Sequence, residues 1–276
     1  MTTRRNLLKF LSTSPAIGLG AALPTALQAE AASAGLLTGN VCTLMPEVTE
    51  GPYYIDPGLV RRDIREDKQG VSLKMRMQVV TADCQPVGNV RVDIWHCDAQ
   101  GNYSGFLGQG SDTAEDTEDQ TFLRGTQMTD DGGVVSFQTI YPGWYRGRTT
   151  HIHFKVFLDE KTVLTGQVFF PDALSQYIFD NDIEYIRSGS RDTVNRNDNI
   201  AAEAGEGAYA YLREQADGYD AVLVIGIDPA AKSQQGGDMG MGGDRPPEPP
   251  PEDAGGPSSG DTDELPAAGS LIPGRE

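Results

Sequence analysis

Two histidines separated by a single residue, His151 and His153, are the side chains in this sequence best placed to do chemistry. The whole chain contains only 3 histidines, so two of them meet in one short segment. The surrounding residues 150–157 are predicted to form a strand, in which side chains two apart project from the same face. Both imidazoles are then close enough to bind one metal ion. Two surface or hydrogen-bonded histidines would explain this pattern equally well.

Two tyrosines favour the metal site over two histidines that bind no metal. Tyr145 lies six residues before His151, just after a Pro-Gly turn at 142–143, and Tyr103 follows a predicted strand. Phenolate is a hard, anionic oxygen donor, and two phenolates favour Fe(III) over Fe(II) or Zn(II). A bound cation also lowers the pKa of a phenol. Each tyrosine alone is explained by core packing, so only the combination predicts a ferric site. Its ligands would be Tyr103, Tyr145, His151 and His153.

The elements that must position these residues are strands. Apolar and polar residues alternate with period two, and turn clusters such as the Asp-Asp-Gly-Gly at 130–133 separate the runs. Strands are predicted at 73–81, 90–95, 134–140, 150–157, 163–170 and 221–227. Helices are predicted only at 174–186 and 207–215. This pattern predicts an all-β chain, an antiparallel β-sandwich or barrel with short helices.

The N-terminal residues 1–34 are typical of a signal peptide, with basic residues, an apolar run and small-residue cleavage sites. The adjacent Arg4 and Arg5 match the twin-arginine export pattern. An ordinary secretory signal is the alternative. The apolar run at 10–23 is shorter than the ~20 residues that a bilayer requires, so no membrane span is expected in the mature form. The protein is expected to be periplasmic or secreted.

The C-terminal residues 229–276 hold 9 of the 17 prolines and no aromatic residue. Such a composition buries too little apolar surface to offset chain entropy, so this tail is predicted to be disordered. Residues 35–228 remain as one domain with one core. The net charge of −18 makes nucleic acid an unsuitable partner, because the protein surface repels phosphate.

Three cysteines, Cys42, Cys84 and Cys97, allow three different disulfide pairings in an oxidising compartment. Cys97 falls in an apolar strand, where a buried free thiol is the usual situation, and this favours Cys42–Cys84. No Cys-x-x-Cys or Cys-x-x-His cluster indicates a zinc finger.

Several segments together resemble the intradiol ring-cleavage dioxygenases. They are 49–54 (TEGPYY), 92–103 (VDIWHCDAQGNY), 122–126 (FLRGT), 129–132 (TDDG), 137–143 (FQTIYPG) and 148–154 (RTTHIHF). The resemblance covers about residues 46–228 and is most specific around the two histidines. It implies a β-sandwich catalytic domain and an Fe(III) cofactor. The substrates would be a small aromatic diol of the catechol type and O2, and the product a cis,cis-muconate-type diacid.

The same resemblance implies individual roles. Tyr103 and His151 would be equatorial ligands, and Tyr145 and His153 axial ones. Tyr145 would be the ligand that leaves when substrate binds and then accepts a substrate proton. Arg148 would face the substrate ring and stabilise its negative charge. Further pocket residues would be Gln167, Pro52 and Tyr54.

Two departures from the family are visible. The helical dimerisation segment of catechol 1,2-dioxygenases is missing, so homo-oligomer formation stays open, and the stretch from Tyr145 to His151 is short. Two other hypotheses compete with the ferric enzyme. One is an exported β-sandwich binding protein with a vestigial metal site. The other is a Zn(II) or Fe(II) site of His151, His153 and a carboxylate, for which Asp159 and Glu160 lie too close in sequence.

Overall fold

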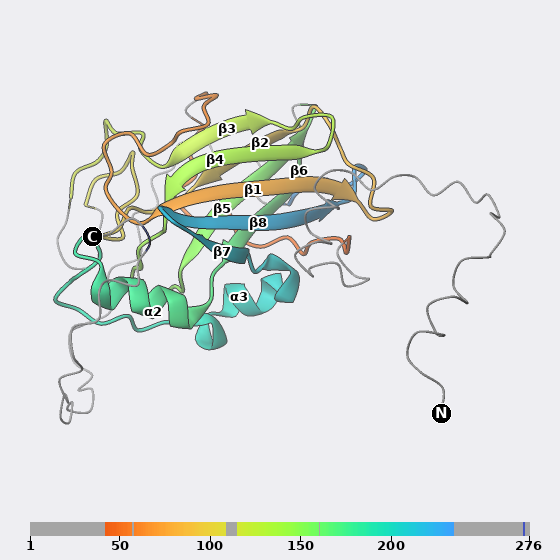
Figure 1. The fold of residues 1–276 in the computed structure, drawn as a ribbon. Coiled ribbons are helices and arrows are strands. Elements are labelled where there is room, and N and C mark those ends of the chain that lie inside the picture. The colour runs from red at the N-terminus through yellow and green to blue at the C-terminus, as the bar shows by residue number, and fades with distance from the viewer. Residues whose placement is uncertain (1–41, 57, 109–114, 160, 235–272, 274–276) are drawn as a thin grey trace, which may run out of the picture. The chain divides into compact units, whose positions relative to one another are not determined.

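The computed structural model describes residues 42–56, 58–108, 115–159, 161–234 and 273. In this part of the chain two four-stranded sheets face each other as a β-sandwich (Figure 1). The first sheet has the order β4 (Val134–Ile140), β1 (Ser72–Thr81), β8 (Gly218–Ile227) and β7 (Tyr211–Gln215). The second has the order β3 (Arg124–Met128), β2 (Arg91–Trp95), β5 (His151–Leu158) and β6 (Lys161–Phe169). The predicted all-β sandwich is confirmed.

The core lies between the two sheets and follows the alternation in the sequence. In β1 the residues Leu73, Met75, Met77 and Val79 are all fully buried. They belong to the same apolar cluster as Ile152, Phe154 and Val156 of β5. The first six residues of β5 are buried at every position, including the ones that face away from this core. The outer face of the second sheet is therefore also covered, and that face carries the two histidines.

The six predicted strands correspond to β1, β2, β4, β5, β6 and β8. Sequence reasoning missed β3, whose residues Arg-Gly-Thr-Gln-Met show no apolar alternation. The predicted helix at 207–215 is wrong, because residues 211–215 form β7 and pair with β8 in a tight hairpin. One pairing also differs from the antiparallel expectation, since β1 and β8 run parallel. The chain crosses over from β6 in the other sheet to β7 and then turns into β8. No hairpin connects β1 to β8, so their pairing is free to be parallel.

The short helices lie in that crossover. They are α2 (Asp172–Asn181), η2 (Asn195–Asn197), α3 (Asn199–Ala204) and η3 (Glu206–Ala208). The predicted helix at 174–186 is α2, which ends at Asn181. Asp198 begins α3, and its carboxylate accepts hydrogen bonds from the amides of Ile200 and Ala201. Within the described residues, no helix has the length and apolar character needed to cross a membrane.

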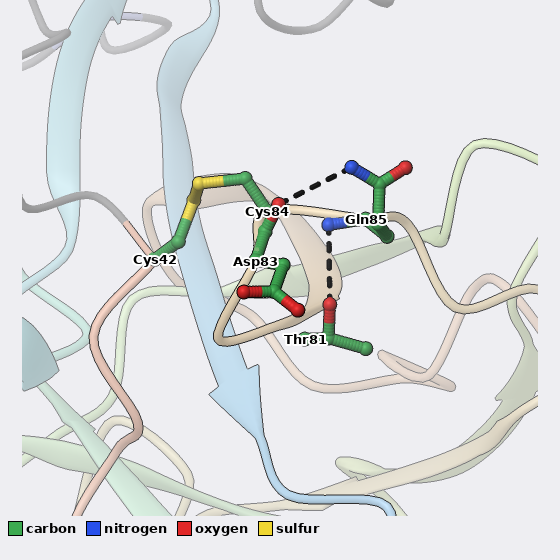
Figure 2. The surroundings of a disulfide bond; sticks show 5 residues. All are labelled: Cys42, Thr81, Asp83, Cys84 and Gln85. Carbon is green, nitrogen blue, oxygen red and sulfur yellow. Dashed lines mark hydrogen bonds between the residues drawn. A yellow bond between two sulfur atoms is a disulfide. The ribbon is translucent and has the colours of Figure 1, made fainter.

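The expected disulfide joins Cys42 to Cys84, with a Cα–Cα distance of 5.2 Å (Figure 2). Cys97 is free and buried. Cys84 lies in the turn after β1, where Thr81 accepts a hydrogen bond from the amide of Gln85 at 3.2 Å. The bond therefore attaches the N-terminal end of the described chain to a well-fixed turn. The predicted pairing is confirmed.

Packing continues beyond the predicted domain boundary at 228. Ser233 and the amide of Gln234 both donate to the carboxylate of Glu47. The proposed signal peptide at 1–34 and most of the predicted tail lie outside the described residues, so both remain predictions.

Candidate metal centre

The centre is built on one row of residues across the outer face of the second sheet. The strand register places Arg124 of β3 opposite Trp95 of β2, and Trp95 opposite His153 of β5. His153 in turn lies opposite Gln167 of β6. His151 projects from the same face as His153, because the two are separated by one residue of a strand. The sheet therefore fixes both imidazoles before any loop contributes.

The two tyrosines reach this face from loops. Tyr103 lies in the loop that follows β2, and Tyr145 lies in the turn that precedes β5. The hydroxyl oxygens of the two tyrosines are 3.5 Å apart. From His151 Nε2, the distances are 3.1 Å to the Tyr145 hydroxyl, 3.4 Å to the Tyr103 hydroxyl and 3.0 Å to His153 Nε2. The structure thus brings all four predicted ligands together around one point.

The protonation of His151 indicates what this arrangement fits. Its Nδ1 lies 2.6 Å from the carbonyl oxygen of Thr149, which can only accept a hydrogen bond, so Nδ1 carries the proton. Nε2 then presents one lone pair, yet four polar atoms surround it within 3.5 Å. One lone pair cannot satisfy four neighbours. A cation among them would satisfy the phenol oxygens and both imidazole nitrogens together, with the second nitrogen of His151 held by backbone as is usual for metal ligands.

Burial sets the charge state of these groups. Tyr103, His151 and His153 are each at most 2% exposed, whereas Tyr145 is half-buried. Burial and the nearby Arg148 guanidinium hold the pKa of His151 well below its usual range. The pKa of His153 is also well below its usual range, mainly because of burial and secondly because of the neighbouring His151. Both imidazoles are therefore neutral, as metal coordination requires.

The phenols behave in the opposite way. Burial raises the pKa of Tyr103 well above its usual value, and burial also raises the pKa of Tyr145. Both phenols are thus neutral at physiological pH unless a cation lies beside them. A trivalent ion with two phenolates and two neutral imidazoles keeps one net positive charge, and this donor set suits Fe(III).

A zinc-like alternative finds no support in the donor set. Across the described ranges, no three residues of the His, Cys, Asp and Glu types gather as a metal site. In the part of the chain that the structure describes, the oxygens within 3.5 Å of His151 Nε2 are the phenol oxygens of Tyr103 and Tyr145.

Arg148 lies at the edge of the centre and is tightly held. Its Nη1 is 3.5 Å from His151 Nε2, and its Nη2 donates to Gln167 Oε1 at 2.6 Å. Its Nε donates to the carboxylate of Asp198 at 2.9 Å, and that carboxylate is 1% exposed. Gln167 also donates to the carbonyl oxygen of Thr49 at 3.0 Å. The predicted pair of Arg148 and Gln167 is therefore in contact, and Asp198 is a member that sequence reasoning missed.

Residues 49–54 lie over the centre. Tyr53 stacks on the ring of Tyr103, with centroids 4.4 Å apart and planes at 17°. Tyr54, a predicted pocket residue, packs on Trp95 and donates to Asp93 at 2.8 Å. Pro52 is exposed. Gly51 adopts a φ of 69°, and a Cβ there would lie 3.4 Å from the His153 ring.

His96, beside this row, has a structural role. It is fully buried, with Nδ1 2.8 Å from the carbonyl oxygen of Cys97 and Nε2 2.7 Å from the Thr139 hydroxyl.

A cavity of about 290 Å³ lies among Trp144, Phe179, Arg187 and Arg191. None of the four donor residues lines it.

Comparisons with known proteins place the chain in a family. A family model described as "Dioxygenase" matches residues 49–213. A solved structure, an intradiol ring-cleavage dioxygenase from Tetranychus urticae, is 34% identical with a TM-score of 0.64. It covers 70% of this chain and 98% of its own.

Curated relatives match less completely. Catechol 1,2-dioxygenase from Acinetobacter baylyi is 29% identical over 72% of this chain and 68% of its own length. Catechol 1,2-dioxygenase 2 from Acinetobacter lwoffii is 31% identical over 45% of this chain and 50% of its own length. The family match covers more than half of the chain, and the chain belongs to the intradiol ring-cleavage dioxygenase family.

Proposed function

We propose that this protein binds Fe(III) through Tyr103, Tyr145, His151 and His153 and cleaves a catechol-type diol with O2 in the intradiol manner. The product would be a cis,cis-muconate-type diacid. The observation that carries the proposal is the convergence of two phenol oxygens and two imidazole nitrogens around one point, at 3.0–3.5 Å. The names of the relatives support the substrate class.

When bound, the ferric ion supplies a Lewis acid that takes the diol as its dianion and makes the ring reactive towards O2. Of the four ligands, Tyr145 is the most accessible. It begins a turn whose next two residues, Arg146 and Gly147, are exposed. Tyr145 is therefore the side chain best able to move aside and, as a phenolate, to accept a proton from the incoming diol. Tyr103, which is buried under Tyr53, would stay in place.

Arg148 provides the positive charge of the site. Asp198 and Gln167 hold its guanidinium in a fixed direction, so little reorganisation is needed when negative charge develops on the substrate ring. The neutral Trp95 ring stacks on His153 with centroids 4.8 Å apart and limits rotation of that imidazole. These residues orient the site, and residues 51–53 cover one side of it.

The test combines colour with product identity. Iron-loaded protein should show a visible phenolate-to-iron charge-transfer band, and oxygen uptake should occur with members of a panel of catechol, protocatechuate, hydroxyquinol and chlorocatechols. Tyr103→Phe and Tyr145→Phe should each weaken the band. Colourless iron-loaded protein would exclude the phenolate site. A yellow semialdehyde product, formed by extradiol cleavage, would exclude the intradiol reaction.

We also propose export through the twin-arginine route to the periplasm or the exterior. The Cys42–Cys84 disulfide supports an oxidising destination. Arg4→Lys combined with Arg5→Lys should leave the protein in the cytoplasm when fractions are compared by immunoblot. Continued export of that variant would indicate an ordinary secretory signal.

A further inference from the structure

The loops that carry the two tyrosines pack backbone against backbone. The amide of Gly143 donates to the carbonyl oxygen of Asp98 at 3.1 Å. A Cβ at Gly143 would collide with the carbonyl oxygens of Asp98 and Ala99. On the other side, a Cβ at Gly101, whose φ is 86°, would collide with the carbonyl oxygen of Trp144. Glycine is therefore required on both sides of this contact.

A single arginine from a distant segment joins these loops. Arg187 Nη1 donates to the carbonyl oxygen of Gln100 at 2.9 Å and to that of Trp144 at 2.5 Å. The guanidinium carbon also lies 3.8 Å from the centroid of the Trp144 ring. Gln100 is three residues before Tyr103, and Trp144 directly precedes Tyr145. Arg187 thus contacts the backbone beside both candidate phenol ligands.

The chemistry of these contacts makes the position of Trp144 depend on Arg187. The carbonyl oxygens of Gln100 and Trp144 accept from the same nitrogen, Arg187 Nη1, and would repel each other without it. The Trp144 carbonyl, which lies in the less exposed place, would also lose a hydrogen-bond partner. The cation also stacks on the indole face, an interaction that lysine reproduces less well because its ammonium is not planar. Trp144 is 3% exposed, so its backbone has little freedom while Arg187 is in place.

We infer that Arg187 is a positioning residue for Tyr145: it fixes the backbone at Trp144 so that the neighbouring phenol points to the metal yet can turn away from it. This inference rests on the proposed function, in which Tyr145 is the ligand that exchanges with substrate. The fixed point at Trp144 and the exposed turn at 146–147 would allow the Tyr145 side chain to move without disturbing Tyr103.

The test uses Arg187→Gln in the full chain, with Arg187→Lys as the conservative variant and the exposed Arg196→Gln as the matched control. At equal iron content, R187Q should shift the charge-transfer maximum and lower kcat/KM by about tenfold, because small misplacements of a reacting group are costly. R187K should restore part of the wild-type charge-transfer maximum and part of kcat/KM, and R196Q should match the wild type in both. The same substitution in a Tyr145→Phe background should leave the spectrum of that variant unchanged, since the affected group is gone.

Two results would overturn the inference. One is an R187Q spectrum identical to wild type at equal iron content, which would leave Arg187 with a purely structural role. The other is a spectral change that persists in the Tyr145→Phe background, which would place the effect on another ligand.

Hydrogen exchange of the metal-free protein separates this failure from a failure of the proposed function. R187Q should speed exchange at the Gly143 amide and in 98–103, and leave β1 and β8 unchanged. If wild-type protein proves colourless with iron, the proposed function fails. Faster exchange in these two loops of R187Q would still support the backbone-fixing role of Arg187. Unchanged exchange would refute that role.

Discussion

Asp198 shows how much of a site can depend on a residue that makes no contact with the reacting atoms. One of its oxygens accepts from Arg148 Nε and the Thr149 amide, both at 2.9 Å. The other accepts from the amides of Ile200 and Ala201 at the start of α3. A single buried carboxylate therefore orients the site's arginine, fixes the entry to β5 and begins a helix.

Asp198→Asn is expected to remove the charge while keeping most of the shape. Breaking a buried ion pair from one side costs about 3 kcal/mol, because the arginine is left without its counter-charge. We expect a clear fall in the free energy of unfolding measured with denaturant, and a fall in kcat/KM of about tenfold or more, which corresponds to ~1.4 kcal/mol.

The exposed Asp180→Asn, which removes the same charge from the surface of α2, serves as the control and should behave like wild type. If Asp198 acts through Arg148, the double variant of Asp198→Asn with Arg148→Gln should lose little more activity than Arg148→Gln alone. Simple addition of the two losses would show that Asp198 acts independently.

Sequence reasoning reached part of this site and not the rest, for a physical reason. His151, His153 and Arg148 lie in one short segment, where strand periodicity relates side-chain directions directly. Asp198 is one of 40 acidic residues and lies 50 residues from Arg148 along the chain, so only the tertiary fold reveals the pair. Tyr53 and Tyr54 are adjacent, and the irregular backbone there gave no rule for which ring would lie on Tyr103.

At the scale of elements, His96 connects the two sheets. It follows β2 in the second sheet, and its Nε2 is paired with Thr139 on β4 in the first. Its complete burial lowers its pKa from 6.5 to about 4, with hydrogen bonding to the Cys97 carbonyl opposing the shift. The neutral form is therefore the one that stabilises the sandwich.

This burial gives stability a defined pH dependence. Between pH 6.5 and pH 4 the unfolded chain binds a proton at His96 that the folded protein does not, so stability falls as pH falls. The loss should approach about 3 kcal/mol at pH 4, relative to pH 7. His96→Gln should be less stable at pH 7 and should show a shallower decline, measured by urea unfolding at several pH values. Parallel slopes for variant and wild type would contradict this assignment.

Strands could be predicted where apolar and polar residues alternate clearly. They could not be predicted where a segment becomes a strand only by pairing with a neighbouring strand. Leu73 to Thr81 alternates clearly, and β1 spans nearly the same residues. In contrast, β7 reads as a polar segment, Tyr-Leu-Arg-Glu-Gln, with good helix formers, and it becomes a strand because it pairs with β8 at a sheet edge. The parallel pairing of β1 with β8 depends on a crossover that local periodicity does not contain.

At the scale of the whole molecule, the disulfide anchors the segment that covers the centre. From Cys42 the chain runs to Gly51 beside His153 and to Tyr53 on Tyr103. The Cys42–Cys84 bond spans 42 residues of sequence separation, and a closed loop of this size stabilises the folded state by about 4 kcal/mol in the chain-entropy account.

Replacing Cys42 and Cys84 together with serine should therefore lower the denaturation midpoint strongly and should speed loss of iron to a chelator, since the cover over His153 and Tyr103 loosens. A reducing agent should destabilise the wild-type protein in the same way and leave the double variant unchanged. Equal chelation rates for the two proteins would show that the cover stays closed without the bond.

The placement of the two candidate metal ligands His151 and His153 on the outer face of a sheet has a consequence for how this protein can diversify. Along β5, residues 152, 154 and 156 fill the space between the sheets, and the intervening positions 151, 153 and 155 project to the side of the chemistry. Substitutions that alter reactivity and substitutions that alter packing thus occupy different, alternating positions of a single strand. Substitutions on one side of the sheet can accordingly change substrate preference while the core packing on the other side keeps the fold stable.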